Sequence, residues 1–322
     1  MDIHGITIVR DEADVIAQSL RAATAWCDHI YVLDNGSTDG TWEIVQDLAR
    51  THEEVIPHKK WQGPFTESLR GEIFRHFRPH RSTPGDWWCR LDADEFYIDD
   101  PRIFLRKVPA TYGNVWSSHF NFYFTGKDLR HYEEDPSHYT SDTPIEERLR
   151  YYRNNWSELR FFRDDGELVW QEGRPWPDAL GRVYPVRIWL KHYQYRSPEQ
   201  IERRLKRRAD LMNRGENHNF FHEVTTNWIT TVVDREGTAR EVDRSLEPSW
   251  RDRIVPPEKL DYDAHDQQLV HRPDLLPNLP TYHHEWMLYS RPGQTMLSLK
   301  SMDPTPVSSW VMTGASWMRN QL

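Results

Sequence analysis

The chain has 322 residues, and its 41 basic and 50 acidic side chains leave a net charge of −9, which argues against a general nucleic-acid binder. With 28% charged and 13% aromatic residues, a largely disordered chain is excluded. The two cysteines, Cys27 and Cys89, cannot build a disulfide framework, so we expect a reducing compartment.

The first residues, 1–9, are too short and too interrupted for the apolar region of a signal peptide. Elsewhere, no run of apolar residues approaches the roughly 20 that span a membrane. The sequence therefore predicts a cytoplasmic protein that is at most peripheral to a membrane.

The first part of the chain alternates apolar runs with helical patterns. Residues 3–9 are rich in β-branched side chains and predict a buried strand, and apolar residues then recur at helical spacing over 16–27, with Asp11 as the expected N-cap. A second apolar run leads into the turn sequence DNGS at 34–37, and a second helical pattern covers 44–49. This alternation predicts a parallel sheet with helices on its faces.

The pattern continues through the middle of the chain. Thr66 is expected to cap a third helix, and a strand is expected over 87–91. An aromatic strand is predicted over 115–124, a long polar loop over 125–147, and a further strand over 184–195.

A strong helix start follows at Ser197, with Pro198 at the first helical position and Gln200 two residues later. Beyond the glycine at 215 the periodicity weakens and prolines interrupt it. We therefore expect a main domain over 1–215 and an irregular, partly helical extension over 216–322.

Acidic residues follow two of the predicted strands. Asp34 ends the second apolar run, while Asp92 and Asp94 come directly after the Trp-rich run at 87–91. In open α/β sheets, ligands bind outside the carboxyl ends of the strands. Two carboxylates on either side of a small alanine can hold a divalent cation, although a single aspartate more often caps a turn.

Three spaced segments of the chain resemble family 2 glycosyltransferases with the GT-A fold. They are VRDE at 9–12, HIYVLDNGSTDGT at 29–41 and LDADEF at 91–96, and a weaker match continues to KHYQYRSPEQ at 191–200. The resemblance implies an α/β, Rossmann-like, mostly parallel sheet flanked by helices. It also implies transfer of a sugar from a nucleotide diphosphate donor with inversion, assisted by Mn²⁺ or Mg²⁺.

The resemblance also implies roles for individual residues. Arg10, Glu12 and Asp34 would contact the base and ribose of the donor. Asp92 would face the ribose and the metal, and Asp94 would be the direct metal ligand.

Two further residues are candidates for the same donor site. His192 would complete the metal shell, and an imidazole beside carboxylates suits Mn²⁺ somewhat better than Mg²⁺. Arg70, on the helix before the DAD segment, is a candidate phosphate contact. Each residue also has a purely structural alternative. His192 could be hydrogen-bonded to the backbone, and Arg70 could lie on a solvated helix face.

An inverting transfer needs a carboxylate that removes the proton of the acceptor hydroxyl. Glu172 is the first choice because of its place between the DAD segment and His192, and Asp178 and Glu158 are alternatives. Glu172 is expected to be buried beside Trp170 and Trp176, which would raise the pKa of its carboxyl. These tryptophans, together with Trp156, would either stack on sugar rings or belong to the core.

The expected partners are a nucleotide diphosphate sugar and a glycan, lipid-linked or other hydroxyl acceptor, with no nucleic acid. The basic run at 203–208 is either a solvated helix face or a surface that attracts an anionic acceptor or lipid. His218 and His222 have the spacing of a zinc site but lack the HExxH sequence, so no metal role is expected there.

Two other functions fit the same architecture. A catalytically inactive nucleotide- or sugar-binding protein is disfavoured by the intact Asp92 and Asp94. A sugar-phosphate nucleotidyltransferase would carry a Gly-rich phosphate loop after the first strand, where this chain reads RDEAD at 10–14.

Overall fold

The computed structural model describes residues 1–184, 186–213, 227–233, 235, 261–263 and 268–270. Most of the expected extension over 216–322, including His218 and His222, lies outside the described residues. The division of the chain at residue 215 therefore stays a prediction.

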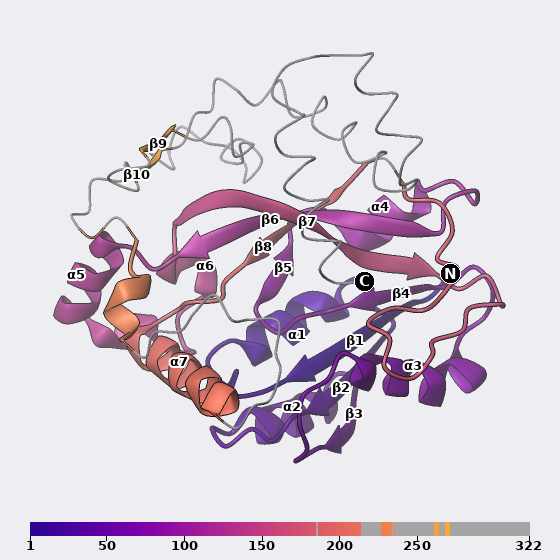
Figure 1. Cartoon of the computed structure of the whole chain (residues 1–322), viewed down its shortest axis with the longest axis horizontal. Helices are drawn as coiled ribbons and strands as arrows, with labels where there is room; N and C mark the ends of the chain where they lie inside the picture. The colour runs from indigo at the N-terminus through magenta and orange to yellow at the C-terminus, as the bar shows by residue number, and fades with distance from the viewer. Residues whose placement is uncertain (185, 214–226, 234, 236–260, 264–267, 271–322) are drawn as a thin grey trace.

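An eight-stranded sheet forms the centre of the molecule, in the order β3-β2-β1-β4-β7-β6-β8-β5 (Figure 1). Its strands are β1 (Ile3–Val9), β2 (His29–Asp34), β3 (Val55–Lys60), β4 (Trp87–Arg90), β5 (Glu95–Tyr97), β6 (Asn114–Tyr123), β7 (Tyr151–Arg163) and β8 (Ile188–His192). Strands β3, β2, β1 and β4 are parallel, as the alternation predicts. The other half is mixed, because β7 runs antiparallel to both β4 and β6, and β5 antiparallel to β8.

The helices follow the strands in chain order: α1 (Ile16–Thr24), α2 (Thr41–Ala49), α3 (Ser68–Arg81), α4 (Pro101–Arg106), α5 (Gly126–Glu134), η1 (Pro136–Tyr139), α6 (Ile145–Arg148), α7 (Pro198–Asn213) and η2 (Trp228–Thr231). A separate antiparallel pair consists of β9 (Asp261–Asp263) and β10 (Gln268–Val270). Among the described residues, no helix has the length and apolar character needed to cross a membrane.

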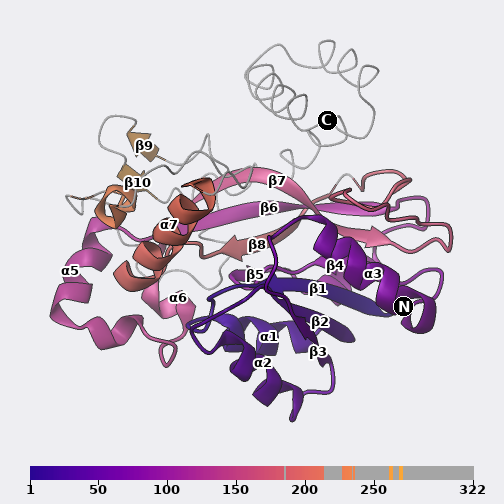
Figure 2. The ribbon, with the colours of Figure 1, turned by 60° about the horizontal axis from the view of Figure 1, so that its bottom comes forward.

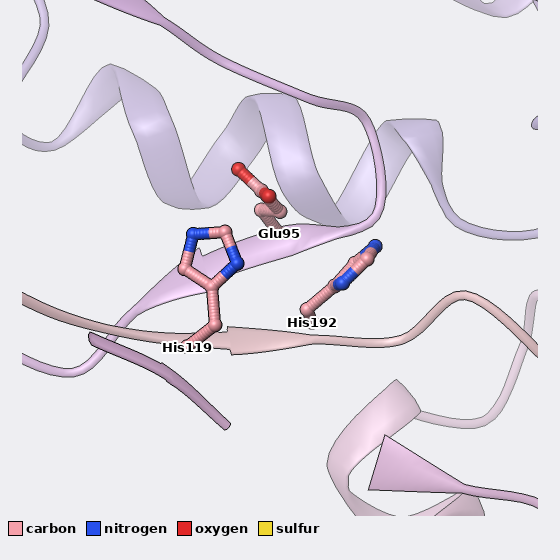
Figure 3. A group of neighbouring side chains, drawn as sticks. All are labelled: Glu95, His119 and His192. Atoms are coloured by element: carbon pink, nitrogen blue, oxygen red, sulfur yellow. The ribbon is translucent and has the colours of Figure 1, made fainter. Parts of the chain in front are cut away.

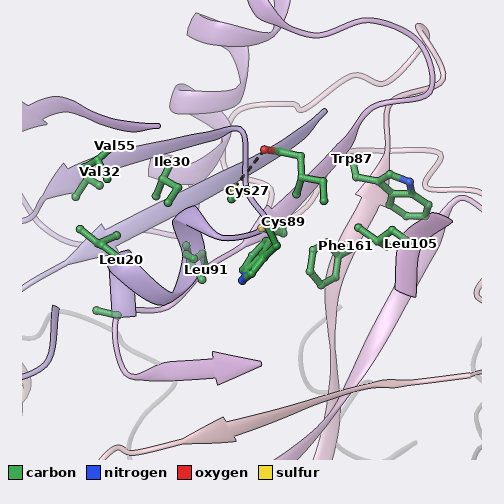
Figure 4. Packing of buried hydrophobic residues seen from close by; sticks show 14 of the residues in the cluster. Leu20, Cys27, Ile30, Val32, Val55, Trp87, Cys89, Leu91, Leu105 and Phe161 are labelled. Atoms are coloured by element: carbon green, nitrogen blue, oxygen red, sulfur yellow. Dashed lines mark hydrogen bonds between the residues drawn. The ribbon is translucent and has the colours of Figure 1, made fainter. Parts of the chain in front are cut away.

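Strand β1 shows why the sheet has two covered faces. Side chains of a strand alternate between its faces. Helices α1 and α2 lie on one face of this half of the sheet, and α3 lies on the other (Figure 2). Ile3 and Val9 belong to the core with residues of α1 and α2, whereas Ile6 packs with residues of α3. Figure 4 shows the first of these cores, where the thiol of Cys27 donates a hydrogen bond to the carbonyl oxygen of Ile3 at 3.2 Å. Both faces are therefore apolar, as in a buried parallel sheet.

A third core lies at the β6–β8 half of the sheet. Phe120 and Phe122 of β6 pack there with Tyr193, which follows β8. Ile201 and Leu205 of α7 belong to the same cluster. This packing anchors α7 at the end of the sheet where β8 finishes.

Two capping expectations are wrong. Helix α1 begins only at Ile16, while Asp11 adopts a left-handed conformation (φ 56°) and accepts a hydrogen bond from the backbone N–H of Thr38 at 2.8 Å. Asp11 thus joins the loop after β1 to the loop after β2. Helix α3 has Glu67, not Thr66, at its N-cap position, with no side-chain cap.

The expected loop over 125–147 is also wrong, because it contains α5, η1 and α6. Thr125 and Asp128 form a reciprocal capping box, in which the side chain of Thr125 accepts from the Asp128 N–H and Asp128 accepts from the Thr125 N–H. The other expected elements are present with boundaries shifted by a few residues, and β3 and β7 were not expected at all.

Buried His4 gives a pH prediction for this fold. Its ring stacks on Trp88 with centroids 4.5 Å apart, and its Nδ1 lies 3.1 Å from the hydroxyl of Tyr31. Burial, reinforced by neighbouring His29, lowers the pKa of His4 from 6.5 to about 4. The folded state therefore holds a neutral ring that the unfolded chain protonates more easily, so stability is lost as pH falls from 6.5 through 4.

We expect wild type to lose about 2–3 kcal/mol more unfolding free energy than His4→Gln between pH 7.5 and pH 4.5. Urea unfolding at both pH values measures this difference. Because all other titrating groups are shared, parallel losses in the two proteins would show that His4 does not carry the effect.

Candidate active site

The strand ends noted in the sequence meet at one edge of the sheet. Strands β1, β2 and β4 are parallel, and two successive antiparallel pairings, through β7, bring β6 and β8 into the same direction. Asp34 is the last residue of β2, and His192 is the last of β8. Asp92 and Asp94 follow β4. All four therefore lie at the carboxyl edge, where ligands of open α/β sheets bind.

Asp34 is buried and uses only one of its oxygens. Its Oδ1 accepts hydrogen bonds from the backbone N–H groups of Gly36 at 2.9 Å and Ser37 at 2.8 Å. Gly36 has φ 79°, a conformation that favours glycine in this tight turn. Within the described part of the chain, Oδ2 has no hydrogen-bond partner. This oxygen is thus free to accept a bond from a ligand hydroxyl or N–H.

Asp92 is surrounded by arginines. Its Oδ1 accepts from Nη2 of Arg70 at 2.9 Å, and its Oδ2 accepts from Nε of Arg90 at 2.9 Å and from Nη1 of Arg160 at 3.3 Å. Burial alone would raise the pKa of Asp92, but the three guanidinium groups hold it well below its ordinary value. Arg70 is buried rather than on a solvated face, and it also pairs with Glu67.

Asp94 and His192 lie close together in the structure. Oδ2 of Asp94 lies 3.5 Å from Nε2 of His192, while Nδ1 of His192 lies 3.2 Å from the amide oxygen of Asn121. Burial would lower the pKa of His192, but neighbouring Asp94 raises it overall. The pKa of Asp94 is lowered in turn, because His192 and two arginines outweigh its burial.

A cluster that the sequence analysis missed lies beside this pair. Figure 3 shows Glu95, His119 and His192 gathered from β5, β6 and β8. One potential ligand atom from each lies within 4.8 Å of the others. The side chain of Arg160 donates to Nε2 of His119 at 3.3 Å and also to Glu95. Burial raises the pKa of Glu95 to about 7 against the pull of Arg160.

Glu12 belongs to a buried network of ion pairs. Its carboxylate accepts from Arg196, and its backbone N–H donates to the hydroxyl of Thr41 at 2.8 Å. Burial raises the pKa of Glu12 even though Arg196 opposes it. Arg10 is half-buried at the same loop, with its Nε 3.9 Å from Oδ2 of Asp11. Both residues thus belong to the loop after β1, which Asp11 and Glu12 join to the segment after β2.

The comparisons with known proteins agree with this arrangement. The family model described as "Glycosyl transferase family 2" matches residues 6–103, which span β1 to the start of α4. Residues 6–103 are therefore similar to family 2 glycosyltransferases. The expected resemblance is confirmed over these residues, and the described residues have the expected α/β fold with helices flanking a central sheet.

Two solved structures are similar at low identity. The crystal structure of S. aureus TarS 1-349 is 14% identical over 39% of this chain and 36% of that chain, with a TM-score of 0.27. This chain thus spans about a third of the length of the TarS 1-349 chain. A mannosyltransferase from Pyrobaculum calidifontis, PcManGT, in complex with GDP-Man and Mn²⁺, is 14% identical over 98% of this chain and 79% of that chain, with a TM-score of 0.32.

The expected burial of Glu172 is wrong. Glu172 lies exposed on the segment between β7 and β8, outside the matched residues 6–103. Trp170 is buried in the core beside Phe74, and its Nε1 donates to the carbonyl oxygen of Arg174 at 2.9 Å. The tryptophan thus anchors this segment to the domain while Glu172 faces solvent. Asp178, half-buried, accepts a hydrogen bond from the side chain of Gln171.

Glu158, the other alternative for the base, lies inside the charged cluster. It sits on β7, and its Oε2 is 3.2 Å from Nη2 of Arg160, which also binds Asp92. Burial would raise the pKa of Glu158, but Arg160 and His119 lower it to about 2. Glu158 is therefore ionised at neutral pH and shares a cation with the DAD segment.

The basic run of α7 is only partly a solvated face. Lys206 is exposed, but Arg207 donates to the carbonyl oxygen of Arg10 at 3.0 Å and to Asp11 at 3.2 Å. Arg204 points toward Asp94, with its Nη1 3.7 Å from Oδ2. Helix α7 thus places the positively charged side chains of Arg204 and Arg207 against the acidic residues that follow β1 and β4.

Proposed function

We propose that this protein is a metal-dependent glycosyltransferase that moves a sugar from a nucleoside diphosphate to an acceptor hydroxyl. The pairing of Asp94 with His192, at the same carboxyl edge of the sheet as the open oxygen of Asp34 and next to residues that match the family 2 model, carries the proposal. The acceptor would be a glycan, a lipid-linked sugar or another hydroxyl compound. Location in the cytoplasm, with at most peripheral membrane contact, stays a prediction.

The residues present suit a divalent cation. Asp94 and His192 offer a carboxylate and an imidazole, and Glu95 has a buried oxygen without a hydrogen-bond partner among the described residues. Mixed oxygen and nitrogen donors suit Mn²⁺ better than Mg²⁺. When bound, such a cation offsets the negative charge that develops on the diphosphate leaving group. Asp94 and His192 would hold it.

Asp92 has a different part in this proposal. Both of its oxygens are engaged by arginines, so it would hold Arg70 and Arg160 near the diphosphate as well as face the ribose. Asp34 would accept a hydrogen bond from the nucleoside through Oδ2. Arg10 and Glu12 would line the same end of the donor.

The transfer also requires a base, which we propose to be a carboxylate acting in an inverting reaction. The position along the chain favours Glu172, with Asp178 as the next choice. The contacts favour Glu158, because Glu158 and Asp92 bind the same guanidinium. A pairwise comparison of variants decides between them.

A screen of nucleotide sugars for Mn²⁺-dependent hydrolysis tests the function, because slow donor hydrolysis needs no known acceptor. We expect one class of donor to release its nucleoside diphosphate, EDTA to stop the release and added Mn²⁺ to restore it. Binding of donors without any turnover would favour an inactive binding protein. Release of pyrophosphate from a sugar phosphate and a nucleoside triphosphate would indicate a nucleotidyltransferase.

A further inference from the structure

Two arginines from the region of α7 reach the same acidic cluster but differ in their bonding. Arg196, just before the helix, is fully buried and donates from Nε to Asp14 at 2.7 Å and from Nη1 to the carbonyl oxygen of Tyr193 at 2.9 Å. Its Nη2 donates to both Asp14 and Glu12. Arg196 therefore has its donors satisfied within the protein, as expected of a structural ion pair.

Arg204 lacks such partners. Its Nη1 lies 3.7 Å from Oδ2 of Asp94 and 3.9 Å from Oε1 of Glu12, which is beyond hydrogen-bonding distance. Its Nε is buried and has no hydrogen-bond partner among the described residues, and the side chain is only 15% exposed. A guanidinium group has five N–H donors, and buried donors left without acceptors cost free energy. Arg204 thus has two carboxylates at ion-pair distance but no hydrogen-bond acceptor among the described residues, and an anionic ligand at the site would supply one.

We propose that Arg204 binds the diphosphate of the donor, an inference that rests on the proposed function. A cation held by Asp94 and His192 would also bind the diphosphate, so the phosphate oxygens would come within reach of a guanidinium 3.7 Å from Asp94. Planar guanidinium groups match phosphate oxygens with two parallel hydrogen bonds. Helix α7 lies outside residues 6–103, so this contact is an addition to the matched domain.

The same contact would act during transfer. The bond between the anomeric carbon and the diphosphate oxygen breaks, and its electron pair passes to that oxygen. The acceptor oxygen forms the new bond to the anomeric carbon, and its proton passes to the carboxylate base. Arg204 donates hydrogen bonds to the phosphate oxygens on which negative charge grows, which stabilises the leaving group.

Isothermal titration calorimetry of Arg204→Met with nucleosides that carry zero, one or two phosphates tests this assignment. The probes are uridine, UMP and UDP, and the matching guanosine, cytidine and thymidine compounds, each with Mn²⁺. Lys206→Met is the matched control, because it removes one positive charge from an exposed position of the same helix. We expect Arg204→Met to weaken binding of the diphosphate by about tenfold to a hundredfold. The affinity of Arg204→Met for the nucleoside should differ from that of wild type by less than about twofold. Lys206→Met should bind all probes with the affinity of wild type.

Binding of Mn²⁺ alone provides a second readout. Removing a positive charge near Asp94 should leave Mn²⁺ bound at least as tightly as in wild type. A structural role predicts the opposite pattern, with weaker binding of Mn²⁺ and of every nucleotide alike. Either that pattern or unchanged diphosphate affinity would overturn the assignment of Arg204.

The two proposals fail in different ways. If none of the four diphosphates binds wild type, the proposed function is wrong; if one binds wild type and Arg204→Met equally, only the role of Arg204 is wrong. Should Arg204→Met lose its native melting transition, Arg204→Lys carries the same comparison. Lysine keeps the positive charge but lacks the planar guanidinium group, which can donate two parallel hydrogen bonds. Arg204→Lys should therefore weaken binding of the diphosphate more than binding of the monophosphate.

Discussion

Replacing Asp94 by asparagine is expected to reduce Mn²⁺-dependent donor hydrolysis by at least about a thousandfold. The change keeps the shape of the side chain but removes the charged oxygen that lies 3.5 Å from Nε2 of His192. A neutral amide binds a divalent cation less well than a carboxylate, so both metal affinity and leaving-group stabilisation should fall. Titration of activity with Mn²⁺, together with direct measurement of bound Mn²⁺, checks both effects.

Asp47→Asn provides the control for this variant. Asp47 lies on α2 with 68% of its side chain exposed, so the same chemical change there should leave activity at the wild-type level. Melting curves should show that both variants fold. Full activity of Asp94→Asn, or full activity of wild type in excess EDTA, would contradict a metal role for Asp94.

Residues at strand ends were the part of the site that the sequence could predict. Asp34, Asp92 and Asp94 follow strands whose apolar runs are continuous, and the direction of a parallel sheet brings such ends to one edge. His192 came from the family resemblance, and the structure places it against Asp94. These features depend on local sequence and on a simple topology.

Residues that depend on strand pairing could not be found in this way. Strand β7 was missed because four consecutive residues, 159–162, are all buried, so the alternation of exposed and buried residues is absent. One of them is Arg160, whose charge is balanced by Glu158 on the same strand and by Glu95 and Asp92, which are 65 and 68 residues away in sequence. A buried arginine among apolar residues gives no local sign of these partners.

Helix α5 is a different case, since its signal was present in the sequence. Thr125 and Asp128 have the spacing of a capping box, and the polar character of the following residues obscured it. The exposure of Glu172 was unpredictable for a further reason. Trp170 turns inward to the core beside α3, and a residue two positions further along then faces solvent.

Replacing Glu158 by glutamine is expected to slow sugar transfer by about 10²-fold, the low end of the range for a general base, because a carboxylate with a pKa of about 2 is a weak base. Glu158 shares Arg160 with Asp92, whereas Glu172 is exposed. The glutamine keeps the side-chain shape but cannot accept the proton of the acceptor hydroxyl. Affinity for the nucleoside diphosphate should stay close to wild type, because Asp34, Asp94 and His192 are unchanged.

Glu172→Gln is the matched comparison, since it makes the same substitution at the carboxylate that chain position favours. We expect it to transfer sugar at the wild-type rate; loss of transfer in Glu172→Gln with normal rates in Glu158→Gln would reverse the assignment. The pH profile adds an independent check. Because the pKa of Glu158 is about 2, transfer should show no acid limb from this group near neutrality. An acid limb near pH 7 would instead point to Glu95, whose pKa is raised to about 7 by burial.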